Sequence, residues 1–99
     1  MGFHKHSFYI YLVPAAQDKF GTRLEKVNGW ANENYTIGFH KHGRTWRATD
    51  LKSGVLICAF PTRKECAEWI TENKQKIKDA YETEKYKQYV REFNELTGG

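Results

Sequence analysis

Apolar and polar side chains alternate along the middle of the chain with the period of a strand. The alternation runs over residues 35–42 and again over 44–50, and a period of two is typical of a half-buried strand. Gly43 separates these two segments, and the turn-forming residues 50–54 connect the second to the apolar run 55–60. The pattern predicts three consecutive antiparallel strands.

The N-terminal third of the chain is harder to interpret. Residues 7–13 form an apolar, β-branched and aromatic run that Pro14 ends, and apolar side chains on both faces predict an inner strand. Glycine and asparagine turn signals interrupt residues 14–34, where we expect a loop with one short strand over 22–27. Trp30, in the same segment, is expected to fold back onto the body.

A capping box predicts where the helical half begins. Residues 62–65, Thr-Arg-Lys-Glu, have the required spacing, so a helix should start at Thr62. The apolar positions of residues 66–81 keep to one helix face, whereas a second apolar stripe is centred on the opposite side of a continuous helix. Either the chain turns between residues 79 and 85, with 79–82 as a new helix start, or the last helix runs on and offers its stripe to a partner. Burial within the chain is the commoner fate of such a stripe. The stripe consists of Tyr86, Tyr89, Val90 and Phe93.

The chain is expected to fold as one α+β domain over residues 1–99, because two cores would leave each piece too small. We predict an antiparallel sheet of three to four strands within residues 1–60. This sheet packs against one long helix, and a further C-terminal helix completes residues 62–96. No apolar run reaches the ~18 residues of a membrane helix, so we expect a cytoplasmic protein with no membrane contact. Cys58 and Cys66 are interpreted as two reduced, small hydrophobic residues.

The positive charge is concentrated in the β-rich half. The net charge is +4, with eight Lys and Arg against four acids in residues 1–60 and eight of each in 61–99. A basic sheet face suits an anionic partner, and Arg and Thr side chains donate well to phosphate oxygens. The alternative is an ordinary solvated sheet face. The residues predicted to contact nucleic acid are His40, His42, Arg44, Thr45, Arg47 and Thr49.

A five-residue repeat, Gly-Phe-His-Lys-His, occurs at residues 2–6 and 38–42 and contains all the histidines. On two neighbouring strands these segments could gather four nitrogen ligands for zinc, nickel or copper. No Asp or Glu adjoins either copy to orient the rings, so exposed cationic edges or anion contacts are favoured. The candidate metal ligands are His4, His6, His40 and His42. Common catalytic and nucleotide-binding motifs are missing from the sequence, and we expect neither an enzyme nor a cofactor.

One part of the sequence resembles a known DNA-binding domain. Residues 44–50 (RTWRATD), the Ser53-Gly54 turn and residues 60–67 (FPTRKECA) resemble the three-stranded sheet and following helix of AP2-like, arm-type domains of phage integrases. The resemblance covers at most residues 35–73. It implies that Thr45, Arg47 and Thr49 face DNA. In style the chain is also similar to small accessory proteins of phages and mobile elements, including anti-CRISPR inhibitors, which would place it in the host cytoplasm.

Three functions remain open from the sequence. The leading hypothesis is non-catalytic binding of nucleic acid or a nucleoprotein complex through the basic sheet face. The second is inhibition of a host protein, such as a nuclease or defence complex, through the C-terminal stripe or the segment near Trp30. The same stripe would alternatively support a homodimer through the C-terminal helix. The third is a His-based metal-dependent enzyme.

Overall fold

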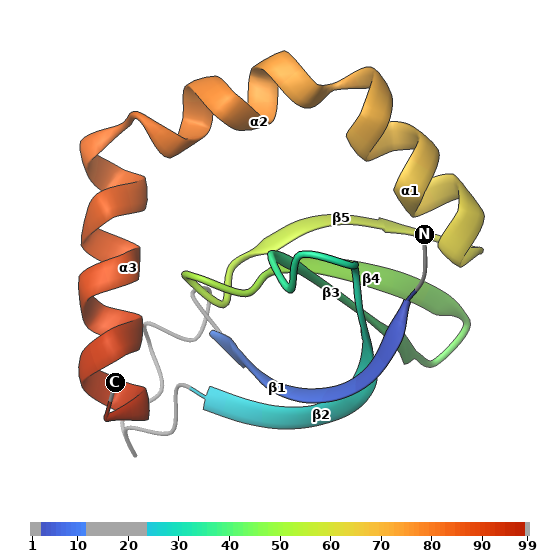
Figure 1. Cartoon of the computed structure of the whole chain (residues 1–99), viewed down its shortest axis with the longest axis horizontal. Helices are drawn as coiled ribbons and strands as arrows, with labels where there is room; N and C mark the ends of the chain where they lie inside the picture. Colours follow the sequence, from blue (N-terminus) through green and yellow to red (C-terminus); the bar gives the residue numbers. More distant parts are fainter. Residues whose placement is uncertain (1–2, 12–23, 99) are drawn as a thin grey trace.

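The computed structural model describes residues 3–11 and 24–98, which form an antiparallel sheet followed by helices (Figure 1). The sheet has five strands in the order β1-β2-β3-β4-β5, so each strand pairs with its neighbour in sequence. Three helices follow the last strand. The strands are β1 (His4–Tyr11), β2 (Leu24–Ala31), β3 (Ile37–His42), β4 (Thr45–Asp50) and β5 (Leu56–Phe60). The helices are α1 (Arg63–Glu72), α2 (Lys74–Tyr81) and α3 (Glu84–Thr97).

The three strands predicted from the alternating pattern are confirmed as β3, β4 and β5. Gly43 lies in the turn of the β3–β4 hairpin, and Gly54 lies in the turn between β4 and β5. Their φ angles are positive, 61° and 75°, and glycine adopts such angles without strain. The prediction of three to four strands was too low, because β2 extends to Ala31 where a short strand within a loop was expected. Residues 12–13 and 22–23 of the predicted N-terminal strands lie outside the described residues.

The prediction that the first strand is an inner strand was wrong, because β1 lies at the edge of the sheet. Its apolar residues are explained by a bend in the sheet. The pairing of β2 with β3 is limited to Trp30 opposite Phe39 and Ala31 opposite Gly38, and the β1–β2 hairpin curls away from the other strands (Figure 1). This curl folds Phe8 of β1 over the sheet, where its side chain is only 6% exposed.

The curled sheet therefore buries apolar side chains on both faces. On one face, Phe39 and Ala48 pack with Cys58 and with Cys66 of α1, and both cysteines are free thiols. On the other face, the Phe8 ring lies so close to the β3 backbone that position 38 requires glycine. A Cβ atom there would lie 2.7 Å from the Phe8 ring.

The helical half starts as predicted and then divides differently. Thr62 caps α1, with its hydroxyl oxygen accepting a hydrogen bond from the Glu65 amide at 3.1 Å. The predicted long helix is divided at Asn73, whose backbone and side chain both donate to the Trp69 carbonyl and end α1. The next break falls within the predicted window of residues 79–85. The N-terminal cap of α3 is Thr83, whereas residues 79–82 had been predicted as the helix start. The helices thus form an arch beside the sheet (Figure 1). Within the described residues no helix is long and apolar enough to cross a membrane.

Candidate functional site

Three aromatic side chains meet beneath one arginine at the start of α1. The guanidinium carbon of Arg63 lies 4.8 Å from the ring centre of Phe3, 6.0 Å from that of Trp30 and 5.7 Å from that of Trp46. The two tryptophan rings are 5.6 Å apart and tilted by 48°. Such distances are typical of cation–π contacts and of aromatic pairs.

The sequence brings these residues together through the sheet register and the helix cap. Trp30 on β2 and Trp46 on β4 flank β3, and both point to the sheet face that carries Phe39. The Thr62 cap fixes the first turn of α1, so that the Arg63 side chain extends over this face of the sheet. Trp46 is half-buried at this position.

The aromatic cluster lines a hollow that is open to solvent. Its volume is about 560 Å³, and Phe3 at its edge is 42% exposed. Lys64 and Ala67 of α1 complete its lining, and no carboxylate belongs to that lining among the residues that the structure describes. We call this site, formed by Phe3, Trp30, Trp46, Arg63, Lys64 and Ala67, the aromatic hollow.

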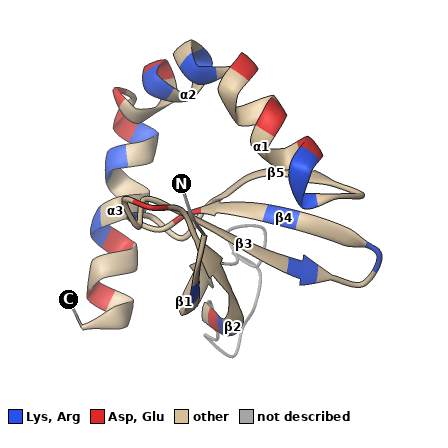
Figure 2. Cartoon of the chain, turned by 45° about the vertical axis from the view of Figure 1, so that its right-hand side comes forward, with Lys and Arg blue, Asp and Glu red and all other residues tan. Residues whose placement is uncertain are grey.

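Two lysines extend the positive charge beside the aromatic hollow. Lys5 lies directly opposite Trp30 in the β1–β2 ladder, and Lys41 lies directly opposite Trp46 in the β3–β4 ladder. Residues paired in this way share a sheet face, and both lysines are exposed. Figure 2 shows basic residues on the β3–β4 hairpin and at the start of α1. Four cations, Lys5, Lys41, Arg63 and Lys64, therefore lie in or beside the hollow.

The basic face predicted from the sequence lies on the other side of the sheet and is only partly accessible. The curled β1 covers it, with the Phe8 ring centre 5.9 Å from that of His40. Of the six residues predicted to contact nucleic acid, His40 and Thr49 are buried, Thr45 and Arg47 are half-buried, and His42 and Arg44 are exposed. The alternation predicted the shared face of the five residues that lie in strands, but it did not reveal the curl, and Arg44 lies in the β3–β4 turn.

His40 is buried, with its side chain only 3% exposed. Among the residues that the structure describes, neither ring nitrogen of His40 has a hydrogen-bond partner, and the same holds for Nε of Arg47 on the adjacent strand. Burial lowers the pKa of His40, and the positive charges of Arg47 and His42 act in the same direction, against a smaller opposing effect of Glu25. These effects favour the neutral form of His40.

The histidines of the repeat contact aromatic rings. Tyr35 stacks on His4 and meets His6 edge-on, with 5.3 Å between ring centres in both contacts. The His40 and His42 rings are 6.4 Å apart. Across residues 3–11 and 24–98 no three His, Cys, Asp or Glu side chains are grouped so that they could hold a metal ion.

Asp50 is the centre of a polar cluster that the sequence did not indicate. Its carboxylate is 4% exposed and accepts hydrogen bonds from the Ser53 amide at 3.0 Å and the Ser53 hydroxyl at 2.6 Å. It also accepts hydrogen bonds from the hydroxyls of Tyr81 at 3.2 Å and Tyr86 at 2.7 Å. Burial, reinforced by the carboxylate, raises the pKa of Tyr81 to about 12 and that of Tyr86 further. The sequence identified Asp50 only as a turn residue, because tyrosines 31 and 36 positions away leave no local signal.

The C-terminal stripe is largely covered within the chain. Tyr86, Tyr89 and Val90 are half-buried, and Phe93 is only 7% exposed. Folding back onto the body, the favoured alternative from the sequence, agrees with this burial.

Comparisons of the chain with models of known protein families, with curated proteins and with solved structures gave no match. The resemblance of residues 35–73 to AP2-like domains therefore stays a prediction.

Proposed function

We propose that this protein binds single-stranded nucleic acid, with unpaired bases entering the aromatic hollow. The observation that carries the proposal is the convergence of Phe3, Trp30 and Trp46 under Arg63 in an open hollow whose described lining holds no carboxylate. Aromatic side chains stack on any nucleobase and contribute ~1–3 kcal/mol per base. An arginine beside them adds stacking and a positive charge.

The surrounding cations suit the sugar-phosphate backbone. Lys5, Lys41, Arg63 and Lys64 lie next to the aromatic rings on the same side of the sheet. Arg44, an exposed member of the residue set predicted from the sequence, adds a further positive charge in the turn of the β3–β4 hairpin. Phosphate contacts position the strand, while the rings hold its bases.

The recessed rings favour a single strand over a duplex. Trp30 and Trp46 are half-buried in the hollow, beside the first turn of α1. A base within a duplex presents only its edge to a protein, whereas an unpaired base can turn its face toward an aromatic ring. The affinity for a single strand should therefore exceed that for the duplex of the same sequence.

A salt titration of binding tests the charge part of this proposal. We would measure the fluorescence anisotropy of a labelled oligothymidylate over a range of salt concentrations. Each phosphate contact on a single strand contributes ~0.7 to the slope of log K against log salt, so four cations predict a slope of about −3, or about 50-fold between 50 and 200 mM salt. The Lys5→Ala, Lys41→Ala variant should halve this slope. The matched control is Lys74→Ala, Lys78→Ala, which removes the same charge from α2 and should leave the slope unchanged.

A tryptophan substitution tests the stacking part. Trp46→Leu keeps an apolar side chain but removes the stacking surface, and we expect at least about fivefold weaker binding from the ~1–3 kcal/mol of one base. Trp69→Leu, on α1 but outside the aromatic hollow, is the control and should bind normally. Absence of binding at low salt, or equal losses in both tryptophan variants, would disprove the proposal.

A further inference from the structure

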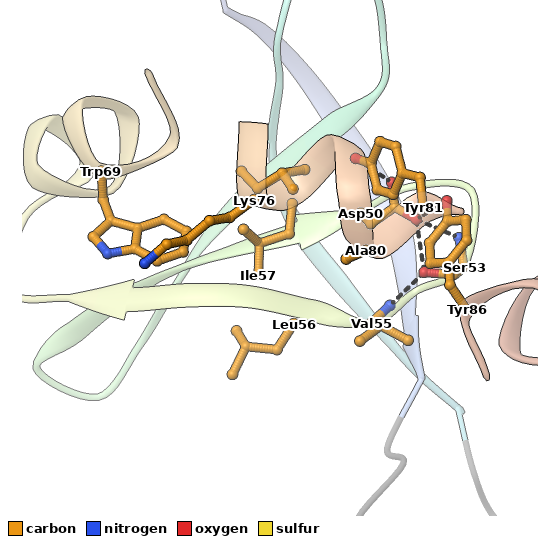
Figure 3. A pocket seen from close by; sticks show the side chains of 11 residues that line it. Asp50, Ser53, Val55, Leu56, Ile57, Trp69, Lys76, Ala80, Tyr81 and Tyr86 are labelled. Atoms are coloured by element: carbon orange, nitrogen blue, oxygen red, sulfur yellow. Dashed lines mark hydrogen bonds between the residues drawn. The ribbon is translucent and has the colours of Figure 1, made fainter. Parts of the chain in front are cut away.

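A second, smaller hollow lies between β5 and the helical arch. Its volume is about 220 Å³, and it is partly open to solvent. Val55 and Ile57 of the β5 region, Trp69 of α1 and Ile77 of α2 supply apolar walls (Figure 3). An apolar cavity of ~150 Å³ accommodates benzene, so this space suits a molecule with one aromatic ring and a short side chain. We call it the arch cavity.

One end of the arch cavity is polar and consists of the cluster around Asp50. Figure 3 shows Asp50, Ser53, Tyr81 and Tyr86 together at this end, with Trp69 and Lys76 at the other. Apolar walls with a few convergent polar groups are typical of sites for small molecules.

The hydrogen bonds at the polar end leave acceptors and no donors. The hydroxyl protons of Tyr81, Tyr86 and Ser53 are all donated to the Asp50 carboxylate. The phenol oxygens keep their lone pairs, and Oδ1 of Asp50 accepts only the hydrogen bond from Tyr81. A ligand group that enters this end must therefore be a hydrogen-bond donor.

Within the described residues, the Asp50 carboxylate has no cationic partner. In residues 3–11 and 24–98 no Lys or Arg forms an ion pair with Asp50, and its four partners are all neutral donors. A buried carboxylate gains most from a positively charged donor, because charge-assisted hydrogen bonds are the strong ones.

We propose that the arch cavity binds a small primary amine with an aromatic body. The ammonium group lies against the oxygens of Asp50, Tyr81 and Tyr86, and the ring lies between Ile57, Ile77 and Trp69. This site is separate from the aromatic hollow, because Trp69 lies in the last part of α1 and Arg63 in its first turn. The inference therefore does not depend on nucleic-acid binding.

A pair of ligands of one shape and opposite charge tests the proposal. We would titrate the protein with 2-phenylethylamine and with 3-phenylpropionate at pH 7 and follow the indole N–H signal of Trp69 by NMR. The amine should shift this signal, and the carboxylate should bind at least about tenfold more weakly, the ratio expected for one charge-assisted hydrogen bond.

A cavity-filling substitution separates binding in the arch cavity from binding elsewhere. Ala80→Leu places a larger side chain into the lining of the arch cavity without touching the Asp50 hydrogen bonds, and it should abolish the amine-induced shift. Ala59→Leu is the matched control, because Ala59 is exposed on β5 and outside that lining. Urea unfolding of both variants verifies that they are folded.

Three results would overturn the inference. These are the absence of any amine-induced shift, equal binding of the amine and the carboxylate, and retained amine binding in a folded Ala80→Leu protein. Each of these results leaves the oligonucleotide titration unaffected, so a failure here is distinct from a failure of the proposed function.

Discussion

Removing the hydroxyl of Tyr86 should destabilise the protein, because this hydroxyl ties α3 to the end of β4. Tyr86 donates to Oδ2 of Asp50 at 2.7 Å, the shorter of the two bonds that link the helical arch to this carboxylate. In Tyr86→Phe the ring can keep its packing against Tyr81, where the ring centres are 4.7 Å apart, and only the hydrogen bond is lost.

The magnitude follows from the type of hydrogen bond. A bond to a charged acceptor contributes ~1.5–3 kcal/mol, and because Tyr86 is half-buried we expect about 2 kcal/mol. For a domain of 60–100 residues this corresponds to a fall in Tm of about 8–16 °C. Tyr81→Phe, which loses the longer 3.2 Å bond, should cost less, about 1 kcal/mol.

Urea unfolding followed by circular dichroism measures this loss. Tyr9→Phe is the control, because Tyr9 is 41% exposed and a surface change of this kind stays within ~0.5 kcal/mol. If Tyr86→Phe unfolded at the same urea concentration as Tyr9→Phe, the Asp50 cluster would not hold the helical arch, and the reasoning would be refuted.

Three further changes have expected outcomes. Burial raises the pKa of Tyr81 to about 12 from its ordinary value of 10. The protonated hydroxyl therefore adds stability that is fully present below pH 10 and is lost as the pH rises toward 12. Urea unfolding should show this loss, and the Tyr81→Phe, Tyr86→Phe double variant should show a flatter dependence of stability on pH. Gly38→Ala places a Cβ atom against the Phe8 and Leu51 side chains and should cost ~1–3 kcal/mol, with an unchanged Tm as the contrary result. Thr62→Ala removes the α1 cap and should cost ~1 kcal/mol by urea unfolding; an equal loss in the exposed Thr71→Ala would contradict a capping role.

Local sequence signals predicted the local parts of the fold. Alternation identified β3 and β4, and the spacing of Thr62 and Glu65 identified the start of α1, because in each case the interacting residues are neighbours in sequence. The break at Asn73 had no comparable signal. Its side chain stops α1 through a hydrogen bond to Trp69, which a polar position in a helical pattern does not reveal.

The candidate sites depend on contacts between distant residues, and the sequence did not predict them. Binary alternation assigned His40 and Thr49 to a solvated face, but both are buried, and the curl of β1 places Phe8 beside His40. The pairing of β2 with β3 places Trp30 on the opposite face, where the first turn of α1 brings Arg63 beside Phe3 and Trp30. Likewise, Asp50 meets Tyr86 only because two helix breaks turn α3 back toward the sheet.

The most direct test of nucleic-acid binding uses the tryptophan indole N–H signals. Trp30 and Trp46 belong to the aromatic hollow and Trp69 to the arch cavity, so the three signals distinguish the two sites. On titration with an oligothymidylate we predict that the Trp30 and Trp46 signals shift and saturate together, while the Trp69 signal stays in place. A titration that moves only Trp69, or none of the three, would contradict binding in the aromatic hollow.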